Sequence, residues 1–357
     1  MKASGCDETQ EDATKSNPLD LALTFGSLPR VTRFMENIED MMDVLSYSPL
    51  HLAAMGRVGS VSTLIQPYFK DMNAQDRCGM TPLHWACSCN NWEAVKVLLE
   101  WKARVDIQDR QGALALHHAC RSGDPSTIEG ILRAGSDVRV LDNHGETALF
   151  YVRSPSAITI LVEHGLDLNH KSNAGQTALH YAAGDSERSG LLESLIENGG
   201  DVNITNDDNY TPLMTAIAKN CHECMEVLIR KGAVMDRITT TGSNVLHIAA
   251  LMAGPKALDL LCNNISGQYI DPDTLDKDEN SPSDCFLRRR EEDNFNLRAS
   301  RDDESRCWDA LLEKARRQKA HFQQTQIATT PLEGSQNQER EVTFKDISHI
   351  IMPGSFP

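Results

Sequence analysis

The chain has 357 residues, a formal net charge of −16 and 40% hydrophobic residues, of which few are aromatic. The negative charge opposes non-specific attachment to nucleic acid or to anionic lipid, and the short, interrupted apolar runs predict no transmembrane helix. The length suits a repeat array or two or three domains, and an aliphatic interior is typical of closely packed helices.

Residues 1–16 are polar and acidic and lack the apolar core of a signal peptide. We therefore expect a disordered leader on an intracellular protein that is cytoplasmic, nuclear or both. The ten cysteines are irregularly spaced in a long chain, which predicts reduced thiols rather than a disulfide framework.

A short motif recurs along the chain with a period near 33 residues, as in the step from position 48 to position 81. It reads SPLHLAA at Ser48, TPLHWAC at Thr81, LALHHAC at Leu114, TALFYVR at Thr147, TALHYAA at Thr177, TPLMTAI at Thr211 and NVLHIAA at Asn244. Weaker copies flank these seven, NPLDLAL at Asn17 and SPSDCFL at Ser281, which gives about nine units. Such a period predicts a solenoid with atypical end units.

Each unit is predicted to hold two helices and a turn. In one copy, Thr81 is an N-cap and Pro82 opens the first helix, while the apolar stripe of residues 94–99 marks the second. Glycine ends several second helices, although Lys102 takes that place here. The turn at residues 76–79 begins with Asp and ends with Gly, which suits a type I turn.

The period and the T-P-L-H-x-A motif resemble the ankyrin repeat from about Asn17 to about Lys319. The resemblance implies an all-α solenoid of stacked helix-turn-helix units with β-hairpin fingers projecting from it. The expected organisation is a disordered leader at 1–16, a solenoid at 17–319 with a mobile insertion near 288–305, and a largely disordered tail at 320–357. Phe150 and Val152 depart from the motif, so we expect distortion in that unit and in the last one.

Five histidines share one position of the motif, namely His51, His84, His117, His180 and His247. A metal site would need several of them to converge, whereas a solenoid spreads them along its length. The resemblance implies that they tie neighbouring hairpins together by hydrogen bonds.

Cys221 and Cys224 form a lone C-x-x-C pair. Zinc usually needs four ligands, and thioredoxin-like redox chemistry needs a βαβ context that is missing here. Signatures of nucleophilic or phosphate-binding sites are also missing. We therefore predict no catalytic site, no metal and no cofactor, and leave a metal or redox role of this pair open.

Two features near the C-terminus have alternative interpretations. The basic run at residues 314–319 is either a nuclear-import signal or the basic end of the last helix, and the nearby acidic residues favour the helix end. The apolar stretch at residues 342–352 is a docking peptide, a segment that folds back on the solenoid, or an unstructured tail.

The predicted function is a non-catalytic scaffold or adaptor that binds partner proteins on the concave surface of fingers and first helices. The alternative is a nuclear coregulator or inhibitor that binds a transcription factor. We expect a monomer with protein partners and without direct contact to nucleic acid or membrane. The candidate contact residues are Arg77, Met80, Ser88, Arg110, Gln111, Arg121, Asn143, His144, Asn173, Asp208, Tyr210 and Thr240. Arg77, Met80 and Arg110 are hypothesised to form one patch.

Overall fold

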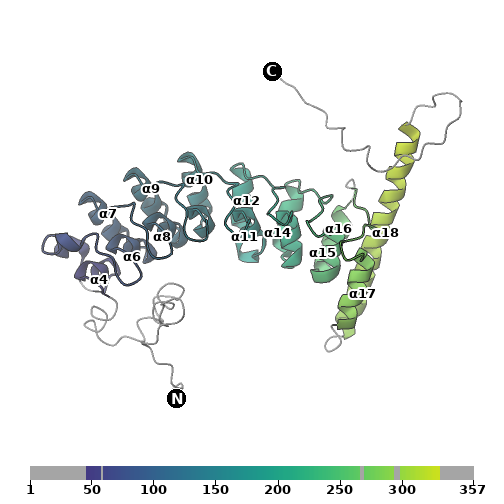
Figure 1. Ribbon diagram of the computed structural model, residues 1–357, viewed down its shortest axis with the longest axis horizontal. Coiled ribbons are helices and arrows are strands. Elements are labelled where there is room, and N and C mark those ends of the chain that lie inside the picture. The colour runs from purple at the N-terminus through teal and green to yellow at the C-terminus, as the bar shows by residue number, and fades with distance from the viewer. Residues whose placement is uncertain (1–45, 58, 266–268, 293–297, 330–357) are drawn as a thin grey trace, which may run out of the picture.

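The computed structural model describes residues 46–57, 59–265, 269–292 and 298–329, so the Asn17 copy and the stretch 342–352 lie outside the described residues. Pairs of helices stand side by side in a long array (Figure 1). All regular elements within the described ranges are helices, which confirms the predicted all-α solenoid.

The described helices form two rows, one of first helices and one of second helices. We number the units 1–8 from the residue at the start of each motif: Ser48, Thr81, Leu114, Thr147, Thr177, Thr211, Asn244 and Ser281. The first helices are α4 (Pro49–Ala54), α6 (Pro82–Ser88), α8 (Ala115–Ser122), η2 (Ala148–Tyr151), α11 (Ala178–Ala183), α13 (Pro212–Ala218), α15 (Val245–Met252) and α17 (Pro282–Glu292). The second helices are α5 (Val61–Leu64), α7 (Trp92–Glu100), α9 (Pro125–Arg133), α10 (Pro155–Glu163), α12 (Ser189–Glu197), α14 (His222–Arg230), α16 (Pro255–Asn264) and α18 (Arg298–Thr329). Short 3₁₀ turns occur at η1 (Phe69–Asp71) and η3 (Ser186–Arg188).

Capping chemistry starts the first helices where the sequence predicts. Thr81 has the extended conformation of an N-cap, with φ −92° and ψ 168°, and Pro82 opens α6. Small side chains then let neighbouring first helices pack closely in six of the units, since one alanine of each is buried there: Ala53, Ala86, Ala119, Ala182, Ala216 and Ala249. The second helices pack against one another in the same order, so each unit is stabilised mainly by its neighbours.

The helix ends follow the predicted glycine pattern. Gly135, Gly165, Gly199 and Gly232 all have positive φ values after their second helices. Lys102 adopts the same left-handed conformation with φ 66°, even though a side chain disfavours it.

Unit 4 is distorted, as expected. Its first helix is the 3₁₀ turn η2, which ends where Val152 turns extended with φ −60° and ψ 136°. Phe150 replaces the shared histidine and packs edge-on against Tyr181, with ring centroids 5.5 Å apart.

The last unit is also unlike the others, but not in the way the sequence suggested. Residues 288–292 and 298–305 belong to the helices α17 and α18 rather than to a mobile insertion, and α18 carries residues 320–329 beyond the expected end of the solenoid. Arg289 explains the order, because it pairs with Glu304 and donates to the carbonyl oxygens of Ala250 and Ala253 at 3.0 and 3.1 Å. Across the described ranges, no helix is both long and apolar enough to cross a membrane.

Candidate functional site

Each finger is a tight turn held by the side chain at its first position. In unit 2, Asp76 Oδ1 accepts the backbone N–H groups of Cys78 and Met80 at 2.8 and 2.9 Å, and Gly79 takes φ 77°. The two sides of the turn share too few backbone bonds to count as strands, so the implied β-hairpins are turns in the described residues. The fingers are therefore short, rigid projections.

Single backbone hydrogen bonds join neighbouring fingers. The donor and acceptor pairs are Arg110 to Cys78, Asn143 to Gln111, Asn173 to His144, Thr240 to Asp208 and Lys277 to Thr241, at 2.8–3.0 Å. Among the described residues no equivalent bond joins the finger of unit 5 (residues 172–176) to that of unit 6 (residues 206–210). The series of backbone hydrogen bonds between fingers is thus interrupted at one place within the described residues, although Lys171 pairs with Asp207 there at 3.3 Å.

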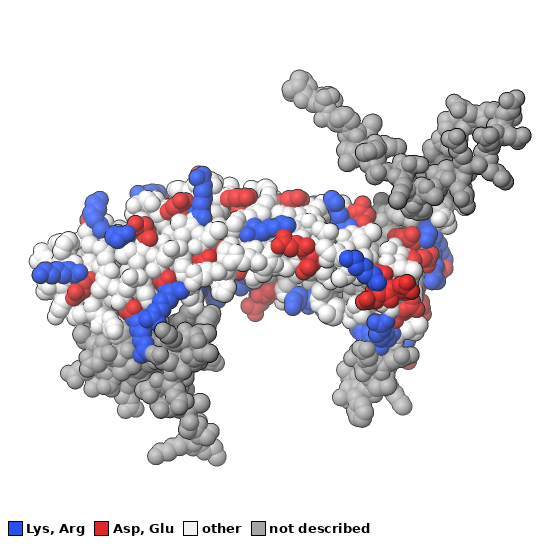
Figure 2. Space-filling view, in the orientation of Figure 1, with Lys and Arg blue, Asp and Glu red and all other residues white. Residues whose placement is uncertain are grey.

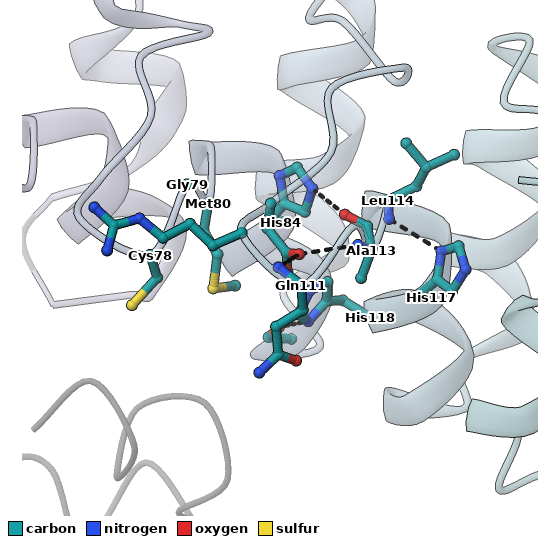
Figure 3. A network of polar contacts seen from close by, with 12 residues as sticks. Cys78, Gly79, Met80, His84, Gln111, Ala113, Leu114, His117 and His118 are labelled. Atoms are coloured by element: carbon teal, nitrogen blue, oxygen red, sulfur yellow. Dashed lines mark hydrogen bonds and ion pairs between the residues drawn. The ribbon is translucent and has the colours of Figure 1, made fainter. Parts of the chain in front are cut away.

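Four of the five shared histidines, His51, His84, His180 and His247, link their first helix to the next finger, as the resemblance implied. The fifth does not, because His117 Nε2 is buried without a hydrogen-bond partner among the described residues. His84 Nδ1 accepts the backbone N–H of Thr81 at 3.1 Å, and its Nε2 lies 3.3 Å from the carbonyl oxygen of Ala113 (Figure 3). Burial lowers the pKa of His84 to about 3 and the pKa values of His51 and His117 to about 4. These imidazoles are therefore neutral, and in His51 and His84 both ring nitrogens are occupied by hydrogen bonds.

Units 2–4 contain a second repeated link between finger and first helix. The finger aspartate that caps the turn also accepts a hydrogen bond from the residue after the shared histidine position. The pairs are Trp85 Nε1 to Asp76 at 2.7 Å, His118 Nε2 to Asp109 at 2.9 Å, and Tyr151 Oη to Asp142 at 2.5 Å. We call these three pairs the aspartate ladder.

The Asp109–His118 pair of the aspartate ladder also contacts a surface serine, Ser88. His118 Nδ1 lies 2.8 Å from Ser88 Oγ, while its Nε2 contacts Asp109, so the three side chains form a Ser-His-Asp line. A nucleophilic serine also needs N–H donors for an oxyanion. Ser88 is the last residue of α6, where the free backbone groups are carbonyl oxygens. The line therefore fits a link between units 2 and 3 better than an acyl-transfer site.

The concave face opens into a groove of about 690 Å³ between units 5 and 6, where the finger row is interrupted. Its polar and aromatic lining includes Tyr181, Asp185, Arg188, Asp208, Tyr210 and Lys219. The tyrosines come from a first helix and a finger, so the groove has an aromatic wall on each of these elements. Such a surface suits recognition of another molecule rather than packing.

Some charged side chains of the groove form ion pairs with each other, and others do not. Asp185 pairs with Arg188 at 3.2 Å, and both remain partly exposed. Lys219 and Asp208 are exposed and have no ion-pair partner within the described part of the chain. Two opposite charges are therefore available on different elements of the groove.

The structure separates the twelve predicted contact residues into three surface groups and one buried residue, Met80. Asp208 and Tyr210 line the groove. Asn143 and Asn173 are exposed, but their side-chain amides donate to the carbonyl oxygens of Arg110 and Asn143 on the preceding fingers at 2.9 and 3.1 Å. Seven more lie outside the groove: Ser88, Arg110, His144 and Thr240 are exposed, and Arg77, Gln111 and Arg121 are half-buried.

Met80 is wrong as a surface residue. Its side chain is only 5% exposed and belongs to the core. The reason is local, because its N–H donates to Asp76 and its carbonyl oxygen accepts from His51 Nε2 at 3.0 Å, which turns the side chain inward. The hypothesised patch of Arg77, Met80 and Arg110 therefore loses its central member.

The sequence interpretation missed Tyr181, Asp185 and Arg188. A signal was present, because Tyr181 occupies the same position as Trp85 and His118, whereas Ser172 replaces the aspartate that those residues contact. A large side chain without its usual acceptor is more exposed, and Tyr181 is 43% exposed.

The lone cysteine pair has a structural role. Cys221 Sγ accepts the N–H of Cys224 at 3.4 Å as the N-cap of α14. Cys224 is buried beneath the loop after α11, with Sγ 3.3 Å from the carbonyl oxygen of Asp185, and burial raises its pKa well above the usual value. Within the described residues no three His, Cys, Asp or Glu side chains cluster as metal ligands would.

Acidic and basic side chains are interspersed along the face seen in Figure 2. The net charge of −16 is therefore not gathered into one acidic field on this face. Mixed charges of this kind support specific contacts better than bulk attraction.

Comparisons with known proteins agree with this architecture. The family described as Ankyrin repeats (3 copies) matches residues 50–142, 116–189 and 185–276. The ankyrin repeat protein FPV031 of Fowlpox virus (strain NVSL) is 35% identical over 74 residues, which is 20% of this chain and only 22% of that protein.

Two solved structures are similar over more than half of the chain. The ankyrin repeat domain of Bcl-3, described as a unique member of the IkappaB protein family, is 29% identical with a TM-score of 0.50, and the match covers 58% of this chain and 94% of that one. The human ASB11 ankyrin repeat domain is 27% identical with a TM-score of 0.50, and the match covers 57% and 92%.

Proposed function

Because the chain belongs to the ankyrin-repeat family, whose repeats mediate protein–protein interaction, we propose that it is a non-catalytic adaptor that binds a partner protein at the groove between units 5 and 6. The groove supports this assignment because it combines exposed aromatic surface with available charges of both signs. Aromatic residues near a concave centre are typical interface anchors. The remaining concave residues, such as Arg110 and Thr240, would add contacts around it.

Filling the groove tests this proposal. A Cβ added at Gly184 would lie 3.4 Å from Lys219 Cγ, so Gly184→Arg should fold and project a long side chain into the groove. Gly190 on α12 of the same unit faces open space, which makes Gly190→Arg the matched control. Affinity capture with mass spectrometry should recover partners with the wild type and Gly190→Arg but not with Gly184→Arg. Equal recovery by all three, with unchanged thermal midpoints, would contradict the proposal.

A nuclear coregulator that binds a transcription factor is the second candidate. Its support is the exposure of Arg316 and Arg317 on α18, where an import receptor could reach them. Arg317 pairs with Glu313 on the same helix, but both side chains remain exposed. The lysines of the basic run are held against the solenoid, because Lys314 donates to the carbonyl oxygen of Cys262 at 2.6 Å and Lys319 pairs with Asp271 at 2.7 Å. Replacing both exposed arginines with glutamine should then abolish nuclear accumulation. Unchanged distribution of the tagged protein in cells would remove this candidate.

A further inference from the structure

We propose that the groove takes an extended peptide segment that carries an arginine and, about two to four residues away, a carboxylate. This inference rests on the proposed function and names the chemistry of the partner. It follows from the two available charges and the two tyrosines that lie between units 5 and 6.

The aromatic wall is fixed in position before any ligand arrives. The Tyr181 ring packs edge-on against Phe150, with ring centroids 5.5 Å apart, so the exposed part of the ring has little freedom to turn. Tyr210 lies half-buried two residues after Asp208. A planar guanidinium can stack on such rings and pair with a carboxylate at the same time, which the ammonium of lysine does less well.

Asp208 is the carboxylate that such an arginine would meet. The neighbouring acids are already engaged, because Asp185 pairs with Arg188 and Asp207 pairs with Lys171 at 3.3 Å. Asp208 is exposed at the finger tip and has no such cation in the described part of the chain. The negative charge of the whole chain also favours the approach of a cationic segment.

Lys219 sets the second requirement. It is the C-cap residue of α13, so this seven-residue helix lies between it and the finger that carries Asp208. Seven residues of α-helix rise about 10 Å, and an extended peptide covers that distance in about three residues. The Lys219 side chain passes close to Gly184 within the groove, where its ammonium can reach a carboxylate on the peptide.

Selection from random linear peptides displayed on phage tests both requirements. We expect the full chain to enrich peptides with an arginine and an acidic residue at the stated spacing. Asp208→Asn should lower the affinity for a fluorescein-labelled enriched peptide roughly two- to fivefold, which is the effect expected for an exposed ion pair. Asp207→Asn on the same finger should leave that affinity unchanged. Lys219→Glu should weaken it similarly, and a peptide whose carboxylate is replaced by lysine should restore binding to that variant.

Two outcomes would overturn the inference. One is enrichment of peptides without an arginine, and the other is equal loss of affinity in Asp207→Asn and Asp208→Asn. Gly184→Arg distinguishes a failure of the inferred peptide chemistry from a failure of the proposed binding function. If Gly184→Arg abolishes binding of enriched peptides that lack the two charges, the groove is a binding site with different chemistry. If Gly184→Arg leaves enriched peptides bound, the groove is not the site and both proposals fail.

Discussion

Units 2–4 and units 5–7 share one helical core but differ in how their fingers are tied to it. In units 2–4 the finger aspartate caps the turn and also binds a side chain of the first helix, as in the pair of Asp109 and His118. In units 5–7 the finger position holds Ser172, Asn206 and Thr239, and the helix position holds Tyr181, Thr215 and Ile248. Of these three helix side chains only Tyr181 is strongly exposed, at 43%, whereas Ile248 is buried, and the groove lies at Tyr181.

The difference separates stability from recognition. The core alanines Ala86 and Ala182 are buried in both regions, so the fold does not depend on the ladder. The aspartate ladder adds buried polar contacts to units 2–4, whereas Tyr181 and Thr215 at the same helix position of units 5 and 6 line the groove. The comparison predicts distinct responses to substitution in the two regions.

The largest expected effect tests whether both regions share one buried core. Ala182→Glu buries a charge without a partner and should destabilise the chain by about 3 kcal/mol or more. Ser186→Glu, on the exposed turn η3 a few residues away, should change stability by less than about 0.5 kcal/mol. Thermal unfolding checks both variants, and an unchanged midpoint for Ala182→Glu would mean that the register of the units is wrong.

The second largest effect compares the finger aspartate of unit 3 with the serine at the same position of unit 5. Asp109→Ala removes the acceptor for the N–H groups of Gln111 and Ala113 and for His118, which should cost about 3 kcal/mol at about 1 kcal/mol for each lost bond. At the equivalent position of unit 5, Ser172 Oγ is buried and makes no hydrogen bond within the described residues, so Ser172→Ala should be nearly neutral. Urea unfolding measures both, and equal losses would remove the distinction between the two regions.

Acid should weaken units 1–3. The pKa values of His51, His84 and His117 lie below the unfolded value near 6.5, so their contribution is complete above that pH and is lost as pH falls toward about 4. Burial raises the pKa of Asp76 to about 6, which opposes the loss because its contribution grows as pH falls. The net loss between pH 7.5 and pH 6 should be on the order of 2 kcal/mol.

Amide hydrogen exchange checks this pH response, since it reports on each unit separately. Protection should fall in units 1–3 as the pH is lowered from 7.5 to 6. Stability that stays constant over this range would contradict the neutral, buried state of the histidines.

The smallest effect concerns the helix ends. Lys102 has φ 66° where other units have glycine, so Lys102→Gly should stabilise by about 0.5–1 kcal/mol. Gly232 has φ 89° and open space around its Cβ position, so Gly232→Ala should destabilise by about 1 kcal/mol through backbone strain alone. Opposite shifts of the thermal midpoint are expected, and shifts of the same sign would contradict this account.

Local rules explain what the sequence could predict. Thr81, Pro82 and Gly135 act through capping and backbone conformation, which depend on a few adjacent residues, and the repeat multiplies each signal. The shared histidines follow from the same repetition. These features were enough for the solenoid.

Contacts between distant residues explain what was missed. Arg289 and Glu304 fell within the expected mobile insertion near 288–305, yet the two residues pair and join α17 to α18. Met80 looked like a finger tip because the pattern does not reveal which way its side chain turns. The exposure of Tyr181 could have been predicted only by comparing two positions of the same unit, the helix residue Tyr181 and the finger residue Ser172, which replaces the usual aspartate acceptor.

The missing backbone bond between the fingers of units 5 and 6 has a mechanical consequence. When elastic links are joined in series, the softest link takes up most of any deformation. The fingers on either side of this joint are each tied to their outer neighbour, so bending should concentrate between them. The curvature of the whole array would then change mainly between units 5 and 6, which is also where a peptide bound in the groove would push the two units apart.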